Sequence, residues 1–334
     1  MVRQRYCIHQ GEKAIDLTNK GGFGTRVLCS GSSGMVGTAL RAALAGSGAE
    51  VVQLVRRAPQ GKGEIQWDPK RGVMLWATER GTESPLEGLE AAVHLGGVNL
   101  AARRWTPAYK REIETSRVDS TRVLAAMLAE LKRPPKTLLV ASAMGFYGDR
   151  GDEVLDDTVL AEGSSVGKGF LPEVCAKWEA ASEAAEKAGI RVVHLRFGVV
   201  LGREGALKKM LPIFRLGLGG RLGSGRQWMS WIGLGDVVRA MLFAMKTETL
   251  SGPVNLVAPN PVTNAEFTRA LGRALHRPAV MPVPAVALRL MFGEMADEAL
   301  LGSTRAVPGK LVGAGFRFEQ PTVDEALAAV GSGM

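Results

Sequence analysis

Three regularly spaced glycines follow a short apolar segment and precede a helix-forming one. Gly31, Gly34 and Gly37 stand between RVLCSG (26–31), which has the composition of a buried strand, and the helical pattern of MVGTALRAALA. In such a strand–turn–helix unit the first glycine permits the turn and the second lets the backbone approach a pyrophosphate. The third lets helix and strand pack closely. The free N–H groups at the helix start then face the phosphates.

This spacing predicts a dinucleotide-binding turn. The alternative is a turn that only connects a strand to a helix and binds no ligand. The residues expected to contact the cofactor are Gly31, Ser32, Ser33, Gly34, Met35 and Val36.

Short apolar segments rich in β-branched residues alternate with helical segments over most of the chain. The alternation predicts a parallel sheet with covering helices, because parallel strands need a crossover connection. The expected fold class is therefore α/β, a doubly wound parallel sheet of the Rossmann type. The expected strands are 26–31, 50–55, 63–67, 91–96, 137–142 and 191–197, and the expected helices are 35–47, 107–132, 172–188 and 204–216.

The texture of the sequence divides the chain into three parts. Residues 1–24 are polar, show no sustained period and are expected to form a loosely ordered leader. Residues 25–250 hold the strand–helix alternation and form the predicted NAD(P)-binding domain. Residues 251–334 are expected to form a small, mainly helical lobe that completes a substrate cleft and does not fold separately.

Composition limits the expected partners. The net charge is +9, but basic residues are scattered among acidic ones, which disfavours a nucleic-acid partner. No segment approaches the ~18 apolar residues of a membrane span, and no signal-peptide pattern is present. Cys7, Cys29 and Cys175 lack the spacing of a metal site, so free thiols and no metal are expected. These features favour a cytoplasmic monomer or homodimer acting on a small molecule.

The end of the second strand favours NADP(H) over NAD(H). NAD-selective proteins place an acid there for the ribose 2′-hydroxyl, whereas NADP-selective ones place arginine nearby for the 2′-phosphate. Here Val55 takes the position of the acid, and Arg56 and Arg57 follow it. Two guanidinium groups offer bidentate contacts to a phosphate, and no carboxylate is expected to oppose them. The alternative is an ordinary solvated strand exit.

Several longer blocks resemble a known family. The glycine turn, HLGG (94–97), SAMGFYG (142–148), LRFGVVLG (195–202) and the late Asp236 resemble extended short-chain dehydrogenases/reductases. More narrowly, the chain is similar to atypical NAD(P)-binding epimerase family proteins with a small C-terminal domain of unknown function. The blocks that carry this similarity are RRWTPAYKREIETSRVDSTRVL, KWEAA, LPIFRLGLGGRLGSGRQWMSWI and TNAEFTRALGRAL. The resemblance covers roughly residues 25–330.

The resemblance implies further cofactor contacts. The backbone of Leu95 and Gly96 would pass close to the cofactor, or else form a buried strand end, and Val200 would lie under the nicotinamide. Arg117 stands where extended members have an asparagine, and its guanidinium could reach the diphosphate or the nicotinamide ribose. Glu112 would orient Arg117 or contact a ribose, unless both residues face solvent.

The usual catalytic residues of this superfamily are largely replaced. Its members use a tyrosine for proton transfer, a lysine four residues later, and a serine or threonine that orients the substrate. None of the three tyrosines, Tyr6, Tyr109 and Tyr147, has a lysine four residues on. Ala143 takes the slot of the serine or threonine.

Other groups must therefore be considered for catalysis. Lys177 lies near the expected position, with Glu173 four residues before it, or it is a surface helix residue. A carboxylate partly buried beside a nicotinamide can have its pKa raised towards neutrality. The candidate catalytic residues are Glu173, Tyr147, Ser142 and Lys177, with Asp149 and Glu153 as further carboxylates.

Two functions are compatible with this pattern. The first is an NADP(H)-binding, epimerase-like oxidoreductase that acts on an unidentified small molecule with a non-standard acid–base group. The second is a catalytically silent NADPH-sensing regulatory or interaction protein.

The Gly-rich segment 218–236 is expected to lie over the cofactor cleft, as a substrate pocket or a packed lobe junction, with Asp236 as the N-cap of the next helix. Arg226, Gln227, Trp228 and Trp231 lie in that segment, whereas His94 and His194 are expected in the core.

Overall fold

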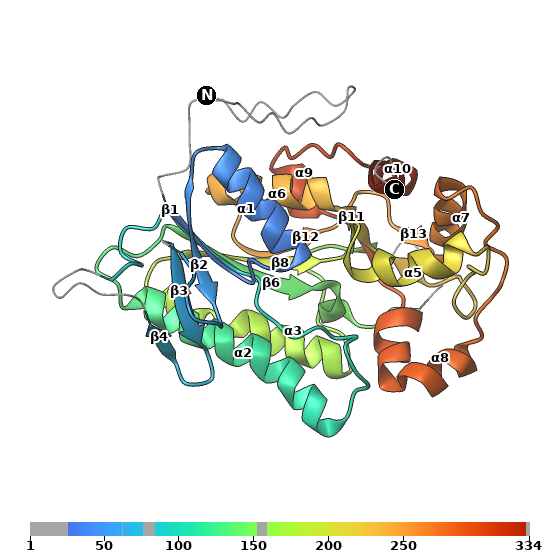
Figure 1. Ribbon diagram of the computed structural model, residues 1–334, viewed down its shortest axis with the longest axis horizontal. Helices are drawn as coiled ribbons and strands as arrows, with labels where there is room; N and C mark the ends of the chain where they lie inside the picture. Colours follow the sequence, from blue (N-terminus) through green and yellow to red (C-terminus); the bar gives the residue numbers. More distant parts are fainter. Residues whose placement is uncertain (1–25, 62, 76–83, 152–158, 332–334) are drawn as a thin grey trace.

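An eight-stranded sheet runs through the computed structural model of the chain (Figure 1). The structure describes residues 26–61, 63–75, 84–151 and 159–331, so the expected leader and the candidate Glu153 lie outside the described residues. The strand order is β12-β8-β6-β5-β1-β2-β3-β4, in which seven strands are parallel and β4 pairs antiparallel with β3. This confirms the predicted doubly wound parallel sheet.

The six predicted strands are present with ends shifted by at most two residues. The structure adds β4 and β12, and β12 begins after residue 250, so the sheet extends past the expected domain boundary. The sequence of β12, GPVNL, contains the Gly, Pro and Asn that are depleted in strands, and Pro is tolerated because β12 is an edge strand. The strands are β1 Arg26–Ser30, β2 Glu50–Val55, β3 Glu64–Asp68, β4 Val73–Leu75, β5 Ala91–His94, β6 Thr137–Ala143, β8 Arg191–Phe197 and β12 Gly252–Leu256.

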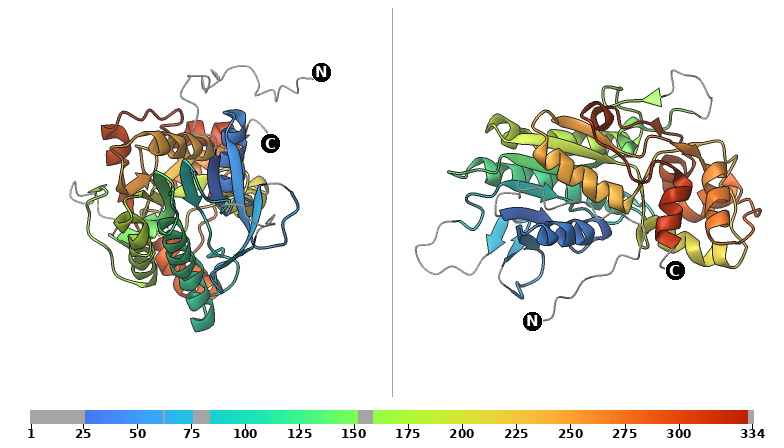
Figure 2. Two further views of the ribbon diagram at one scale, coloured as in Figure 1. Left: turned by 90° about the vertical axis from the view of Figure 1, so that its left-hand side faces the viewer. Right: turned by 90° about the horizontal axis from the view of Figure 1, so that it is seen from above.

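Helices cover both faces of this sheet. Figure 1 shows α1 and α6 above the sheet and α2 and α3 below it, and each layer packs on its own apolar cluster. The right view in Figure 2 shows α1 and α6 side by side. The helices are α1 Met35–Gly46, α6 Leu234–Lys246 and α9 Gly309–Gly313 with the first cluster, and α2 Pro107–Ala129, α3 Phe170–Ala180 and α4 Glu183–Lys187 with the second.

The helix expected over 172–188 is two helices, α3 and α4, with a break at Ser182. The Ser182 hydroxyl donates to the carbonyl of Glu179 (2.8 Å) and lies 2.8 Å from Nε2 of His194. Serine competes in this way with regular helical hydrogen bonding. The break therefore places a polar partner beside the buried imidazole of His194.

The carboxyl edge of the sheet carries short paired strands and a mainly helical C-terminal region, as predicted. A third apolar cluster forms its core and includes Leu207, Trp231 and Phe267. No described helix is both long and apolar enough to cross a bilayer. The remaining elements are η1 Met144–Tyr147, β7 Val159–Leu160, β9 Val199–Leu201, α5 Gly205–Arg215, β10 Trp228–Met229, β11 Trp231–Gly233, β13 Val262–Thr263, α7 Asn264–Ala274, α8 Ala285–Phe292, η3 Ala296–Leu301, β14 Arg305–Ala306 and α10 Val323–Gly331.

His94 ties three elements together in the core, as its place in a buried-strand pattern predicts. Its Nδ1 lies 2.5 Å from the Ser30 hydroxyl of β1, and its Nε2 lies 2.9 Å from the Ser120 hydroxyl of α2. The residue is fully buried, and burial lowers the pKa of His94 to about 4. The imidazole is therefore a neutral structural group at physiological pH.

We expect the free energy of unfolding to fall as the pH drops from about 6.5 towards about 4, because the unfolded chain then binds a proton at His94 that the folded chain does not. Chemical denaturation at several pH values measures this. The variant His94→Gln should show a weaker pH dependence than the wild type, and the exposed control His276→Gln should match the wild type. A folded-state NMR titration of His94 with a midpoint near 6.5 would refute the assignment.

Candidate functional site

The glycine turn between β1 and α1 is shaped by close backbone contacts. Gly31 has a φ of +67°, and a Cβ there would lie 2.7 Å from the carbonyl oxygen of Leu95. A Cβ on Gly37 would clash with the carbonyl oxygen of Gly31. Gly34 differs, because its φ is −76° and its Cβ would meet only the Gly31 carbonyl oxygen at an ordinary 3.5 Å. The packing of the chain thus demands glycine at 31 and 37 but not at 34.

The start of α1 presents backbone donors at this turn. Gly34 is the N-cap residue and supplies no side-chain cap, and the N–H groups of the first helical turn have no acceptor inside the helix. Ser32 is buried and Ser33 is exposed. With the positive end of the helix dipole, these groups form an arrangement suited to an anion.

Arg56 and Arg57 are both exposed after β2, but their surroundings differ. Arg57 donates to the two carboxylate oxygens of Glu64 at 2.8 and 2.7 Å. The Arg57 guanidinium and a hydrogen bond from the Gln60 N–H lower the pKa of Glu64 to about 2. The expectation that no carboxylate opposes the arginines was therefore wrong for Arg57, because β2 pairs with β3, which carries Glu64. Arg56 has no hydrogen-bond or ion-pair partner among the described residues.

Arg117 lies beside the segment that follows β5. Its guanidinium donates to the carbonyl oxygens of Ile113 (3.1 Å) and Val98 (3.0 Å) and packs against Gly97, where a Cβ would approach its Cζ to 3.2 Å. Its Cζ is 5.3 Å from the centre of the Trp178 ring. Burial lowers the pKa of Arg117, and no carboxylate of the described chain is paired with it.

The other positions near the turn are placed as follows. Leu95 and Gly96 follow β5, and Leu95 donates its N–H to the Ser30 carbonyl (3.3 Å). Glu112 does not orient Arg117, because its carboxylate pairs at 3.6 Å with Arg103 in the segment before α2. Val200 lies in β9, paired with Ile232 of β11, and is half-buried against the core under α1 and α6.

The register of α3 differs from the one expected. Leu171 and Cys175 face the sheet edge, because a Cβ on Gly145 would lie 3.2 Å from Leu171 Cβ and 3.7 Å from Cys175 Sγ. Glu173 and Lys177 are exposed, and Lys177 donates to Glu114 of α2 at 2.8 Å. The hydrogen bond that Lys177 donates to the Glu114 carboxylate raises the pKa of Lys177. Glu173 and Lys177 therefore do not occupy the positions that face Gly145.

Ser142 belongs to a buried ion-pair network. Its hydroxyl donates to Glu179 (2.7 Å), and Glu179 binds Arg196 through two hydrogen bonds of 2.8 Å each. The side chains of Arg196 and Glu179 are 3% and 12% exposed, so water screens this pair weakly. Ser142 is itself 2% exposed and thus supports α3, contrary to the expected contact with a substrate.

Tyr147 completes the same network and is fully buried. Its hydroxyl donates to Asn255 Oδ1 (2.7 Å) and accepts from Arg196 Nη1 (2.9 Å). Burial raises the pKa of Tyr147. The hydroxyl of Tyr147 therefore has protein partners in Asn255 and Arg196 and lies 3.0 Å from the Ala161 carbonyl oxygen, and its expected role in proton transfer stays a prediction. Asp149 also has a structural role, accepting the N–H groups of Gly151 (3.0 Å) and Ser303 (2.9 Å).

The Gly-rich segment is partly a packed junction. Trp231 is fully buried, with its indole N–H donating to the Asn260 carbonyl (3.0 Å), and Gln227 is buried. Asp236 is not the N-cap of α6, which begins at Leu234. Its carboxylate instead accepts the N–H groups of Glu319 (3.0 Å) and Gln320 (2.9 Å) and thereby anchors the C-terminal segment.

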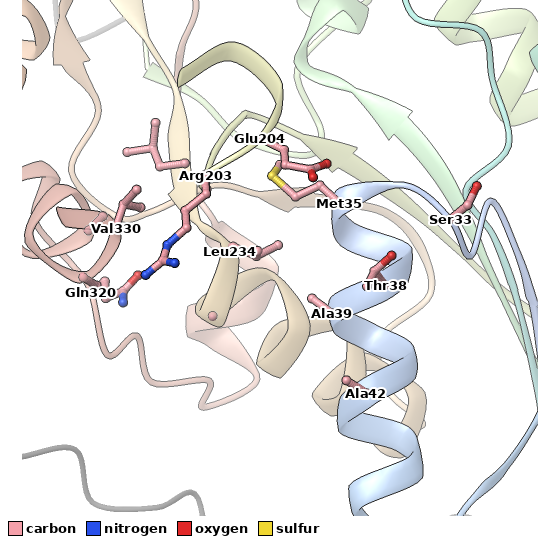
Figure 3. A pocket seen from close by; sticks show the side chains of 15 residues that line it. Ser33, Met35, Thr38, Ala39, Ala42, Arg203, Glu204, Leu234, Gln320 and Val330 are labelled. Atoms are coloured by element: carbon pink, nitrogen blue, oxygen red, sulfur yellow. The ribbon is translucent and has the colours of Figure 1, made fainter. Parts of the chain in front are cut away.

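A cavity of about 530 Å³ borders the glycine turn on the α6 side (Figure 3). Ser33 and Met35 line it together with Thr38 of α1, and Arg203 and Gln320 line the opposite wall. Figure 3 shows the Arg203 side chain pointing towards Gln320. Across the described ranges, no group of three His, Cys, Asp or Glu side chains is arranged to hold a metal ion.

The chain belongs to the NAD-dependent epimerase/dehydratase family, whose sequence profile matches residues 27–256, and the profile of a domain of unknown function matches residues 283–330. It is 48% identical over 302 residues to the epimerase family protein Mb2239 of Mycobacterium bovis, which covers 90% of this chain and 96% of that protein. It is 38% identical over 309 residues to the epimerase family protein SDR39U1 of Mus musculus, which covers 91% of this chain and 99% of that protein.

Solved structures agree with this assignment. The crystal structure of human epimerase family protein SDR39U1 (isoform 2) with NADPH has a TM-score of 0.82 at 34% identity and covers 92% of this chain and 100% of that one. A UDP-galactose 4-epimerase structure has a TM-score of 0.66 at 18% identity over 92% of this chain and 97% of that one, which shows the shared fold.

We expect Glu179→Gln to lower the free energy of unfolding by about 3–5 kcal/mol, because it leaves the buried Arg196 guanidinium without its counter-charge. Tyr147→Phe should cost about 1–3 kcal/mol, since it removes one hydroxyl from the same network. Urea denaturation measures both values. The control Lys177→Met breaks an exposed ion pair and should cost at most about 1 kcal/mol. Equal losses in all three variants would contradict the buried network.

Proposed function

We propose that the chain binds NADPH at the glycine turn and acts as an epimerase-like oxidoreductase on a small molecule. The observation that carries this proposal is the contrast among the three glycines. Gly31 and Gly37 are demanded by the contacts of the chain itself, whereas Gly34 has free space at its Cβ and sits at the helix N-terminus. A glycine at that point serves the close approach of a pyrophosphate to the backbone.

In this proposal different described residues contact different parts of the cofactor. The backbone N–H groups of residues 31–36 bind the diphosphate, and Arg56 binds the 2′-phosphate. Leu95 and Gly96 line the path of the cofactor, Arg117 reaches the diphosphate or the nicotinamide ribose, and Val200 lies under the nicotinamide. The NADPH in the human relative supports the phosphorylated cofactor, whereas the structures of more distant epimerase-like enzymes contain NAD.

The cofactor, when bound, supplies or accepts a hydride. Proton transfer has to come from a group other than the usual tyrosine, because Leu171 and Cys175 occupy the face of α3 that meets Gly145. Burial raises the pKa of the Cys175 thiol to about 12, so it stays protonated. Among the four candidate catalytic residues, Glu173 is an exposed carboxylate without an ion-pair partner among the described residues. We propose it as the acid–base group, acting on a substrate that reaches α3 from its exposed side and not from the side that faces Gly145.

The C-terminal region is proposed to complete the substrate cleft. Two contacts of the C-terminal region support this: Glu294 pairs with Lys110 (2.7 Å), and the Glu298 carboxylate accepts the first N–H groups of α3 (2.8 Å). In the preceding domain, Lys209 of α5 also donates to the Ala101 carbonyl (2.9 Å). The contacts of Glu294 and Glu298 connect the elements that follow β5 and β6 to the C-terminal helices, so a substrate between them would be enclosed.

A second candidate function is a catalytically silent, NADPH-sensing protein. The observation that favours it is the same pair, Leu171 and Cys175, because an apolar side chain and a protonated thiol stand on the helix face where proton-transfer groups are expected. In that case cofactor binding would be retained and turnover lost.

We expect Arg56→Ala to weaken NADPH binding about tenfold or more and to leave NADH binding nearly unchanged, because only NADPH carries the 2′-phosphate. Isothermal titration calorimetry with both cofactors measures this. Arg57→Ala is the matched control and should have a smaller effect, since Glu64 already engages that guanidinium. An equal loss for the two cofactors would contradict the assignment of Arg56.

Turnover separates the two candidate functions. Purified protein loaded with NADPH should lose absorbance at about 340 nm with at least one member of a broad panel of carbonyl compounds, and Glu173→Gln should slow this loss about 100-fold. The surface variant Glu183→Gln is the control, because Glu183 lies on α4 and forms an exposed ion pair with Lys187. Retention of bound NADPH without hydride loss across the whole panel would favour the sensing function.

A further inference from the structure

Arg305 and Trp228 place buried hydrogen-bond donors together without acceptors. The Arg305 guanidinium lies over the Trp228 ring, with its Cζ 4.5 Å from the ring centre. The Nε and Nη1 atoms of Arg305 and the Nε1 atom of Trp228 are buried and have no hydrogen-bond partner among the described residues. Buried donors are almost always paired in folded proteins, so three unpaired donors in one place need an explanation.

The backbone around these residues is fixed by short hydrogen bonds. Thr304 donates its N–H to the Trp228 carbonyl (3.1 Å), and the Trp228 N–H donates to the Ser303 hydroxyl (2.9 Å). The neighbour Ala306 is fully buried in the apolar cluster that contains Tyr147. Since side chains alternate along a strand, the Arg305 side chain projects from the opposite face of β14.

No carboxylate of the described chain neutralises this guanidinium. Asp149 reaches the same segment, but its carboxylate accepts the backbone N–H groups of Ser303 (2.9 Å) and Gly151 (3.0 Å). Arg305 as a whole is half-buried, but its Nε and Nη1 atoms are buried without a counter-charge, and a cation–π contact offsets only about 0.5–2 kcal/mol of the cost of burying them. A bound anion would supply the counter-charge that the described chain does not give Arg305.

We propose that Arg305 and Trp228 form a subsite for an oxyanion group, a carboxylate or a phosphate, on the small molecule that this protein binds. The proposal deepens the proposed function and rests on it, since Trp228 belongs to the Gly-rich segment that lies between the cofactor domain and the C-terminal helices. The forked guanidinium of Arg305 matches the planar geometry of a carboxylate and two oxygens of a phosphate. The indole N–H of Trp228 supplies a further donor.

The test uses the full chain, with and without NADPH, and two probes, sodium phosphate and sodium malonate. Calorimetric titration should show that at least one probe binds, and the stronger of the two identifies the oxyanion chemistry. Arg305→Gln should weaken that binding at least tenfold, and Trp228→Phe should weaken it less, because it removes one neutral donor. Arg289→Gln is the matched control, since it removes the same charge from an exposed pair with Asp297, and it should bind as the wild type does.

Thermal unfolding without added anion gives a second readout. If Arg305 is kept for a ligand, Arg305→Gln should unfold at the same or a higher temperature than the wild type, because a half-buried charge without a carboxylate partner in the described chain is removed. A lower unfolding temperature for this variant would overturn the proposal in favour of a structural cation–π contact. Absence of binding of both probes at about 10 mM, or equal binding by Arg305→Gln, would also overturn it. Anion binding that persists in a protein without hydride transfer would reject the oxidoreductase and keep the subsite.

Discussion

The ion pair between Glu179 and Arg196 determines how the carboxyl edge of the sheet is built around α3. It joins α3 to the end of β8 in a place where water screens little, and Ser142 and Tyr147 complete its hydrogen bonds. Removing either charge would leave the other one buried, so the pair fixes the rotation of α3 about its own axis. That rotation turns Leu171 and Cys175 towards Gly145 and turns Glu173 and Lys177 towards solvent. The identity of the side chains that α3 turns towards Gly145 thus depends on an interaction one helical turn away.

The two ends of the site use different chemical groups, mainly backbone N–H groups at the glycine turn and arginine side chains at the other end. At the glycine turn, the backbone N–H groups of the helix start and Arg56, which has no partner among the described residues, create positive potential without buried side-chain charge. At the other end, Arg117 is held by carbonyl oxygens and an indole face, and Arg305 stacks on Trp228. Both of these arginines lack a carboxylate partner in the described chain. The site as a whole presents hydrogen-bond donors and positive charges, so it is suited to a ligand that carries hydrogen-bond acceptors and negative charge.

Much of the fold and the cofactor end could be predicted from the sequence. The glycine spacing and the β-branched strands depend on local preferences, so the sheet, its strands and the turn follow from them. β12 was missed because Pro253 and Asn255 interrupt the apolar pattern of an edge strand. The contact of Arg57 with Glu64 could not be predicted, because it depends on the register between β2 and β3.

The positions of the side chains on α3 were harder to predict from the sequence, for a related reason. Without a tyrosine and a lysine to mark the register of α3, Glu173 and Lys177 were chosen by their spacing alone. The apolar pair Leu171 and Cys175, followed four residues later by Glu179, was the signal that could have found the inward face. Arg305 gave no signal at all, since its environment is made by segments far apart in the sequence.

The bidentate contact between Glu64 and Arg57 has a consequence for cofactor choice. The two carboxylate oxygens of Glu64 bind Arg57 in the geometry that two phosphate oxygens would adopt. The Glu64 carboxylate therefore occupies the place of one phosphate group in the proposed ligand. A cofactor 2′-phosphate would have to compete with the Glu64 carboxylate for Arg57, whereas Arg56 has no competing partner among the described residues. Selectivity for the phosphorylated cofactor then depends on how strongly Arg57 binds the 2′-phosphate compared with the Glu64 carboxylate. Glu64 on β3 therefore influences this selectivity as much as the two arginines after β2 do.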